Sequence, residues 1–434
     1  MPCPWQSFKG LTQGLTRRRF LSGGLMAAAG ASIGANPLEA ALTPGQETAR
    51  PDNTAEPFWG DHQSGILTPL QANTYFAAFD LVTTDRADVV KLMQAWTAAA
   101  ANLTQGKPAT DFGQDTSVPA PDSATTLGLP PSRLTLTFGF GAGLFTKDGK
   151  DRYGLAKQRP AAFVDLPKFT GDQLVPERTG GDLSVQACAD DPQVAFHAIR
   201  QLSRLAYNIA VMRWVQTGFT PGYKAGQTPR NLMGFKDGTN NPSIKDPALM
   251  DKVVFVGDEG PDWMRGGSYL VVRRIRIALE HWDRMNLAFQ EQTVGRQKYS
   301  GAPLTGKDEF DAADYDAADK DGNSIIPENS HLRLAAAAHN DGAQIFRRPY
   351  SFNDGTNVTA ERWPPWREEM EFDAGLLFMC YQRDPRTGFI KIFEKMSKFD
   401  MMNQFVTHVG GGHFAIPSGI AEGQYLGQRL FEKA

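Results

Sequence analysis

Asp237 lies in the strongest turn signal of the chain, GFKDGTNNP at residues 234–242. Asp-Gly and Asn-Pro pairs favour turns, so one interpretation of this segment is a purely structural loop. A carboxylate held between glycines on a short loop can also approach a reacting group and transfer protons to and from it. The pattern by itself leaves both interpretations open.

His331 has the most distinctive context of the seven histidines. It ends a polar loop, PENSH at residues 327–331, directly before the run LRL. A histidine in such a place can present its imidazole to a cavity. A structural role is the alternative. The chain contains no HExxH motif or paired-histidine spacing that would indicate a zinc site.

Arg347 and Arg348 follow an apolar Ile-Phe pair and form either a surface charge pair or an anion-holding pair. Two other patterns fail on inspection. The run GFGAG at 139–143 lacks the last glycine of a phosphate-binding loop. The acidic loop at 317–328 resembles a calcium-binding loop, but Ala317 occupies the first ligand position and Pro327 interrupts the helix that should follow.

The overall charge argues against a nucleic-acid partner. The formal net charge is −3, and several basic residues fall in the first 41 positions, which leaves a more acidic body. Binding to nucleic acid or to an anionic membrane would require a basic face. Cys188 and Cys380 are the two cysteines outside that segment, and we expect buried free thiols rather than a disulfide.

The N-terminal segment has the pattern of an export signal. Thr16-Arg17-Arg18-Arg19-Phe20-Leu21 precedes a short apolar run, and small residues lie near Ala40-Ala41. This order is typical of a secretory leader, and the paired arginines before Phe-Leu indicate the twin-arginine type. The apolar run is shorter than the roughly 20 residues of a membrane-spanning helix.

The remaining chain shows two successive groups of alternating strands and helices. Strands are predicted over 75–83, 134–140, 267–277 and 375–382, the second of them half-buried. Helices are predicted over 87–103 and 278–290, with helical periodicity from 194, and the segment 389–400 precedes a helical stretch around 401–406. Two such groups favour two α+β halves. We therefore divide the chain into a signal peptide (1–41), a flexible spacer (42–60), an N-terminal domain (61–225) and a C-terminal domain (226–434).

Several motifs in a fixed order carry a resemblance to a known family. GFKDGTNNP, SHLRLA, the Arg347-Arg348 pair, GLLFMCYQRD and GGGHFAIP follow one another, and GILTPLQANTYFAAFDL and GRQKYSGAP extend the series. In this combination the chain resembles the dye-decolourising-type haem peroxidases, and most closely the twin-arginine-exported deferrochelatase/peroxidase of bacterial iron-uptake operons. The resemblance covers nearly everything from about residue 60 to the end.

The resemblance implies an α+β fold of two ferredoxin-like domains, of the dimeric α+β barrel type, with one haem b in the C-terminal domain. His331 would be the proximal ligand of the haem iron, Asp237 the distal acid/base and Arg347 the distal cation. Asp384 would be the partner of the second His331 nitrogen. The other residues implied to contact the cofactor are Gly238, Thr239, Asn240, Ala336, Ala337, Ala338, Leu376 and Phe378. Relatives have Asn-Pro-Arg where the three alanines stand, so their contacts would come from the backbone.

The implied function is a periplasmic or otherwise exported peroxidase that reduces hydrogen peroxide and oxidises dyes or phenolic donors in one-electron steps. Two alternatives remain. One is a deferrochelatase that takes haem as its substrate and releases iron with the porphyrin intact, in iron acquisition; the other is a non-catalytic haem carrier. The implied partners are an organic electron donor, the twin-arginine export machinery, iron-uptake proteins and a second copy of the chain in a homodimer.

Overall fold

The computed structural model describes residues 54–221, 227–360 and 368–432. The expected signal peptide and most of the expected spacer therefore lie outside the described residues. The described strands are β1 (Asn73–Leu81), β2 (Thr135–Gly141), β3 (Leu183–Ala189), β4 (Ala210–Phe219), β5 (Ser268–Ile277), β6 (Phe346–Arg347), β7 (Tyr350–Ala360), β8 (Glu368–Gln382) and β9 (Val406–Ile416). The α-helices are α1 (Arg86–Leu103), α2 (Ala142–Phe145), α3 (Pro192–Leu205), α4 (Pro247–Val253), α5 (Leu279–Asp283), α6 (Leu287–Val294), α7 (His331–Ala335), α8 (Phe389–Phe399) and α9 (Gln428–Glu432).

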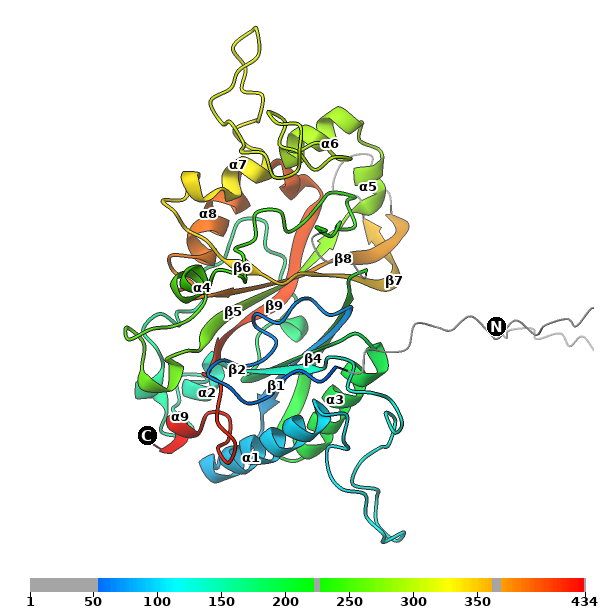
Figure 1. The fold of residues 1–434 in the computed structure, drawn as a ribbon, viewed down its shortest axis with the longest axis vertical. Helices are drawn as coiled ribbons and strands as arrows, with labels where there is room; N and C mark the ends of the chain where they lie inside the picture. Colours follow the sequence, from blue (N-terminus) through cyan, green and yellow to red (C-terminus); the bar gives the residue numbers. More distant parts are fainter. Residues whose placement is uncertain (1–53, 222–226, 361–367, 433–434) are drawn as a thin grey trace, which may run out of the picture. The chain divides into compact units, whose positions relative to one another are not determined.

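The strands form two ferredoxin-like groups joined into one closed antiparallel sheet (Figure 1). In the N-terminal half the strand order is β2-β3-β1-β4, and α1 and α3 are the crossover helices. In the C-terminal half the order β9-β5-β8-β7 repeats this arrangement, with α8 connecting β8 to β9. The halves meet where β2 pairs with β9 and β4 pairs with β7. The predicted fold class is confirmed.

Two hydrophobic clusters hold this arrangement together. One lies between the N-terminal strands and the pair α1 and α3, where the Trp96 indole donates to the carbonyl of Leu202 at 2.8 Å. The other contains side chains of both halves, including Phe76, Trp214 and Phe414. Because both halves contribute to one core, the C-terminal half is fixed against the N-terminal half by burial of apolar surface.

Three element predictions differ from the structure. The helical stretch predicted around 401–406 is only a short 3-10 helix over Met401–Gln404, and strand β9 begins at Val406. The predicted helix over 278–290 is wrong as a single element, because the Asn286 side chain accepts from the N–H of Phe289 and starts a second helix, α6. The strand predicted to be half-buried, β2, is buried throughout, because the helix layer covers its outer face. By contrast, the helix predicted over 87–103 is present as α1, and Asp85 caps it by accepting from the N–H of Ala87.

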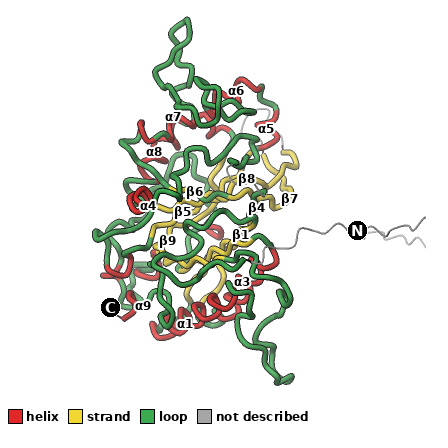
Figure 2. Tube along the Cα trace, in the orientation of Figure 1, coloured by secondary structure: helices red, strands yellow, loops and turns green. Residues whose placement is uncertain are grey.

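The part of the C-terminal half that matters for function lies between the sheet and the helices α7 and α8. A long loop connects α6 to α7 over this region (Figure 2). Cys188 and Cys380 are both free and buried, as expected. In the described ranges we find no helix with the length and apolar character needed to cross a bilayer.

Candidate functional site

A cavity of about 660 Å³ lies in the C-terminal half. Its walls come from the loop at 234–242, strands β5 and β8, and helices α7 and α8. Eleven of the twelve site residues expected from the sequence line it: Asp237, Gly238, Thr239, Asn240, His331, Ala336, Ala337, Ala338, Arg347, Leu376 and Phe378. A volume of this size is ordinary for a site that encloses a cofactor.

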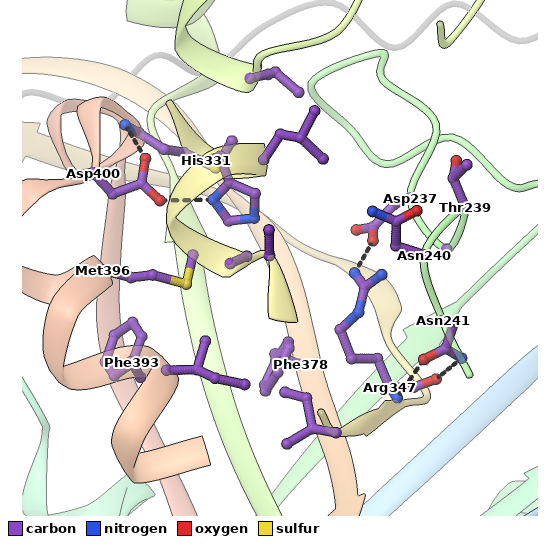
Figure 3. Close-up of a pocket in the computed structure, with 18 of the residues that line it drawn as sticks. Asp237, Thr239, Asn240, Asn241, His331, Arg347, Phe378, Phe393, Met396 and Asp400 are labelled. Atoms are coloured by element: carbon purple, nitrogen blue, oxygen red, sulfur yellow. Dashed lines mark hydrogen bonds and ion pairs between the residues drawn. The ribbon is translucent and has the colours of Figure 1, made fainter. Parts of the chain in front are cut away.

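His331 is the first residue of α7, and its ring is held by a carboxylate. Its Nδ1 lies 2.7 Å from Oδ2 of Asp400, at the end of α8. Apolar contacts of Leu334 with Ile392 and Met396 pack α7 against α8 and so bring the two residues together. With Nδ1 engaged, Nε2 is the ring nitrogen that faces the cavity (Figure 3). A histidine held in this way has a fixed orientation and a basic free nitrogen.

The electrostatic surroundings of His331 favour its protonated form. Burial alone would lower the pKa of His331, but the carboxylate of Asp400 outweighs it and the pKa is raised above 6.5. The more distant Asp237 contributes in the same direction, and Arg347 opposes it. The exposed 38% of the His331 side chain belongs to the surface of the cavity.

The prediction that Asp384 is the hydrogen-bond partner of His331 is wrong. Asp384 lies in the turn after β8, and both of its carboxylate oxygens accept from the Arg386 side chain. Its Oδ1 also accepts from the backbone N–H of Arg386 at 2.8 Å, so the carboxylate closes its own turn. This local bonding directs Asp384 away from the cavity, which it does not line.

Asp237 and Arg347 form an ion pair on the side of the cavity opposite His331 (Figure 3). The Nη1 atom of Arg347 donates to Oδ1 of Asp237 at 2.6 Å. Asn241 fixes the backbone of Arg347 from both sides, donating to its carbonyl and accepting from its N–H, each at 2.8 Å. The guanidinium therefore projects from β6 in one direction, with one oxygen of Asp237 as its partner.

The loop around Asp237 depends on its glycines and on the long loop beyond α6. Gly234 and Gly238 have φ values of 85° and 135°, a region in which residues with a side chain are strained. Across from them, Glu309 forms an ion pair with Lys236 and accepts from the Thr239 hydroxyl at 3.0 Å. The turn interpretation of this segment is confirmed, and the same turn places Asp237 in the wall of the cavity.

The polar residues of the cavity that were not predicted from the sequence include Asp400, Arg296 and His408. Asp400 follows the amphipathic helix α8, and no motif in the sequence indicated that its carboxylate would contact His331. His408 lies on β9, is 9% exposed, and burial together with nearby Arg273 lowers its pKa to about 3. His408 is therefore neutral over the ordinary pH range, and its ring packs against Phe393 with centroids 4.6 Å apart.

The side chains of this cavity suit a metal that is held within a larger cofactor, so that the cofactor supplies most of the metal's ligands. Within the described ranges, no three histidine, cysteine or acidic side chains gather closely enough to bind a bare ion. Instead, one oriented imidazole faces a large cavity whose walls include Leu376, Phe378 and Phe393. Across the cavity stand one carboxylate and one guanidinium, a pair suited to moving a proton and stabilising developing charge.

Comparisons with known families agree with this geometry. The family model described as "Dyp-type peroxidase, N-terminal" matches residues 63–220, and the one described as "Dyp-type peroxidase, C-terminal" matches residues 228–421. The interval between the two matches contains the domain boundary that we expected after residue 225, in a stretch (222–226) outside the described residues. That boundary stays a prediction.

Relatives are similar over almost the whole chain. A dye-decolorizing peroxidase of Thermobifida fusca is 37% identical, with 97% of this chain and 98% of the relative covered. A deferrochelatase of Escherichia coli is 36% identical, with 96% of each covered. The solved structure of ferric DtpA from Streptomyces lividans has a TM-score of 0.78 and 41% identity, covering 87% of this chain and 97% of that one.

Proposed function

The chain belongs to the Dyp-type peroxidase family, and from this premise we propose that it binds one haem b and works as a peroxidase on hydrogen peroxide and organic electron donors. The observation that carries the proposal is the placement of His331 opposite the Asp237–Arg347 pair in one cavity. The predicted donors are dyes or phenols, oxidised in one-electron steps.

The residues present fit a haem. His331 offers a free nitrogen to iron, and the Asp400 carboxylate strengthens it as a ligand. Leu376 and Phe378 from β8 and Ile392 from α8 give the apolar walls that a porphyrin face requires. Ala336, Ala337 and Ala338 contribute small side chains to the wall, which leaves their backbone near the cofactor.

The Asp237–Arg347 pair would supply the two functions that cleavage of peroxide requires from the protein, namely proton transfer and stabilisation of negative charge. Bound haem supplies an iron centre that accepts electrons from the donor and passes them to peroxide. Asp237 accepts a proton from one peroxide oxygen through its second carboxylate oxygen and returns it to the other, because its first oxygen is held by Arg347. Arg347 stabilises the negative charge that develops as the O–O bond lengthens. Asn241 keeps Arg347 in place while this happens.

One optical measurement tests the proposal. Protein reconstituted with haem should show a Soret band, and hydrogen peroxide should change that band before an added phenol or dye restores it. A Soret band that does not respond to peroxide would favour the non-catalytic carrier. The Asp237–Arg347 pair argues against a non-catalytic carrier, because binding of haem requires a ligand for the iron but no distal acid/base.

Deferrochelatase activity is a second candidate, favoured by the 36% identity to relatives of that name over 96% of their length. In that case haem is the substrate, iron leaves, and the activity serves iron acquisition together with uptake proteins. The same cavity would serve both reactions. Incubation with haem and a reductant distinguishes them, since release of iron leaves a metal-free porphyrin that fluoresces and peroxidase activity does not.

We predict that haem uptake weakens as the pH falls through the raised pKa of His331. A proton and iron compete for Nε2, so affinity should drop by up to about tenfold per pH unit below that pKa. The folding stability of the haem-free protein should have the opposite pH dependence. The stabilisation from the His331–Asp400 ion pair is complete below pH 6.5 and is lost as the pH rises through the raised pKa of His331. Soret titrations of haem-free protein across pH measure the first effect, and thermal unfolding measures the second.

The matched control for this pH dependence is Asp400→Asn. Asparagine can still accept from the Met402 N–H, which Asp400 does at 2.8 Å, but it no longer carries the charge that favours protonated His331. The pH midpoint of haem uptake should therefore move down. An unchanged midpoint in Asp400→Asn would show that another group controls haem uptake.

We also propose export by the twin-arginine pathway, on the basis of residues 16–21 alone. Changing Arg17 and Arg18 together to lysine should leave folded protein in the cytoplasm, as measured by cell fractionation. Arg19→Lys is the matched control and should be exported normally. Unimpaired export of the Arg17/Arg18 variant would refute this assignment.

A further inference from the structure

Arg296 is a buried cation in the wall of the cavity. It follows α6, its residue surface is 7% exposed, and it is one of the residues that line the cavity. Burial lowers the pKa of the Arg296 guanidinium, while Tyr315 and Glu309 act in the opposite direction. A buried charge of this kind is costly unless an opposite charge or several good acceptors satisfy it.

The protein acceptors of Arg296 are neutral. Its Nη1 atom donates to the carbonyl oxygens of Gly301 at 2.7 Å and Glu309 at 3.0 Å. Its Nη2 atom makes one long contact, 3.5 Å, with Oδ1 of Asn240, another residue of the cavity wall. The side-chain carboxylate of Glu309 is engaged elsewhere, with Lys236 and Thr239. Among the described residues, no carboxylate forms an ion pair with Arg296.

The other strong cations of the cavity wall are already neutralised. Lys236 is paired with Glu309, and Arg347 is paired with Asp237. Arg296 is thus the lysine or arginine of the lining set that lacks a carboxylate partner in the described part of the chain. A guanidinium with an under-used N–H edge at a cavity surface is well suited to a carboxylate, which it can bind with charge-assisted hydrogen bonds.

We propose that Arg296 binds a propionate carboxylate of the haem, and that this contact selects a porphyrin with a free carboxylate. The inference rests on the proposed function, because it requires the porphyrin to occupy this cavity. The same guanidinium holds the carbonyls of Gly301 and Glu309, so the bound carboxylate also ties the long loop beyond α6 to the cofactor.

The test compares haem with its dimethyl ester, which has the same ring and iron but no free carboxylate. Soret titrations of the haem-free protein should give an affinity about 10- to 100-fold weaker for the ester, as expected for loss of a hydrogen bond between charged groups. In Arg296→Gln the two porphyrins should bind with nearly equal affinity. The matched control is Arg333→Gln: Arg333 also donates to loop carbonyls, those of Tyr315 and Ile326, but does not line the cavity. It should keep the full preference for haem.

If Arg296→Gln does not fold, the proposal can be tested on the unaltered protein by comparing its affinity for haem with its affinity for the monomethyl and dimethyl esters. One cation holds one carboxylate, so the monomethyl ester should bind within a few-fold of haem, and the loss should appear only with the dimethyl ester. Equal binding of haem and dimethyl ester, or a preference that survives in Arg296→Gln, overturns the inference and leaves the peroxidase proposal intact. Absence of a Soret band with every porphyrin overturns both.

Discussion

Haem-free His331→Ala should fail to form a stable Soret band when haem is added. His331 offers the cavity a nitrogen whose orientation is fixed by Asp400, and without His331 the helix α7 would offer no ligand to the iron of a bound haem. Loss of a group that only orients a metal ligand costs about 10- to 100-fold in affinity, so loss of the ligand itself should cost at least about 100-fold. Soret titration measures the effect directly.

The control for this variant is the second imidazole of the cavity. His408→Leu removes a neutral, buried histidine from β9, and we expect its haem affinity to stay close to that of the unaltered protein. Free imidazole added to His331→Ala should restore the Soret band, which would also show that the variant is folded. A His331→Ala protein with normal affinity, or the reverse pattern in the two variants, would mean that the ligand is misassigned.

Asp237→Asn should slow the reaction with peroxide by about 10²- to 10⁴-fold while haem binding is retained. Asparagine has the same shape and can still accept from Arg347, but it cannot take up the proton of peroxide. Arg347→Leu should slow the same step, because the developing charge loses its cation. Stopped-flow mixing of each haem-loaded variant with hydrogen peroxide, followed at the Soret band, gives the rates.

The Asp237–Arg347 ion pair leads to a further prediction, for the variant in which both residues are changed. Residues that act as one unit have non-additive effects, so Asp237→Asn/Arg347→Leu should be little slower than the slower single variant. If Asp237→Asn reacts at the parent rate while Arg347→Leu does not react, Arg347 is the essential distal group and Asp237 only positions it. Additive losses would show that the two side chains act independently.

Local signals in the sequence singled out the loop around Asp237 and the polar run before His331, and the family resemblance then assigned them to the site. Glycines on both sides of Asp237 predict a tight turn, and the structure gives both of them positive φ values. The polar run before His331 predicts a loop that can present the imidazole to a cavity; in the structure this loop ends where α7 begins, and His331 lines the cavity. The alternating strands and helices favoured two α+β halves, and the family resemblance carried by the ordered motifs implied that each half is ferredoxin-like.

The contacts between distant segments were decided by the tertiary structure. His331 and Asp400 are 69 positions apart and meet because α7 packs on α8. Asp384, the partner that the family resemblance implied, uses its carboxylate to close its own turn. Closure of the sheet through the β2–β9 and β4–β7 pairs, and the burial of Arg296 beside the cavity, likewise depend on where whole elements pack. Spacing along a chain fixes which face of an element a side chain takes, whereas its partner across the cavity depends on how that element packs against others.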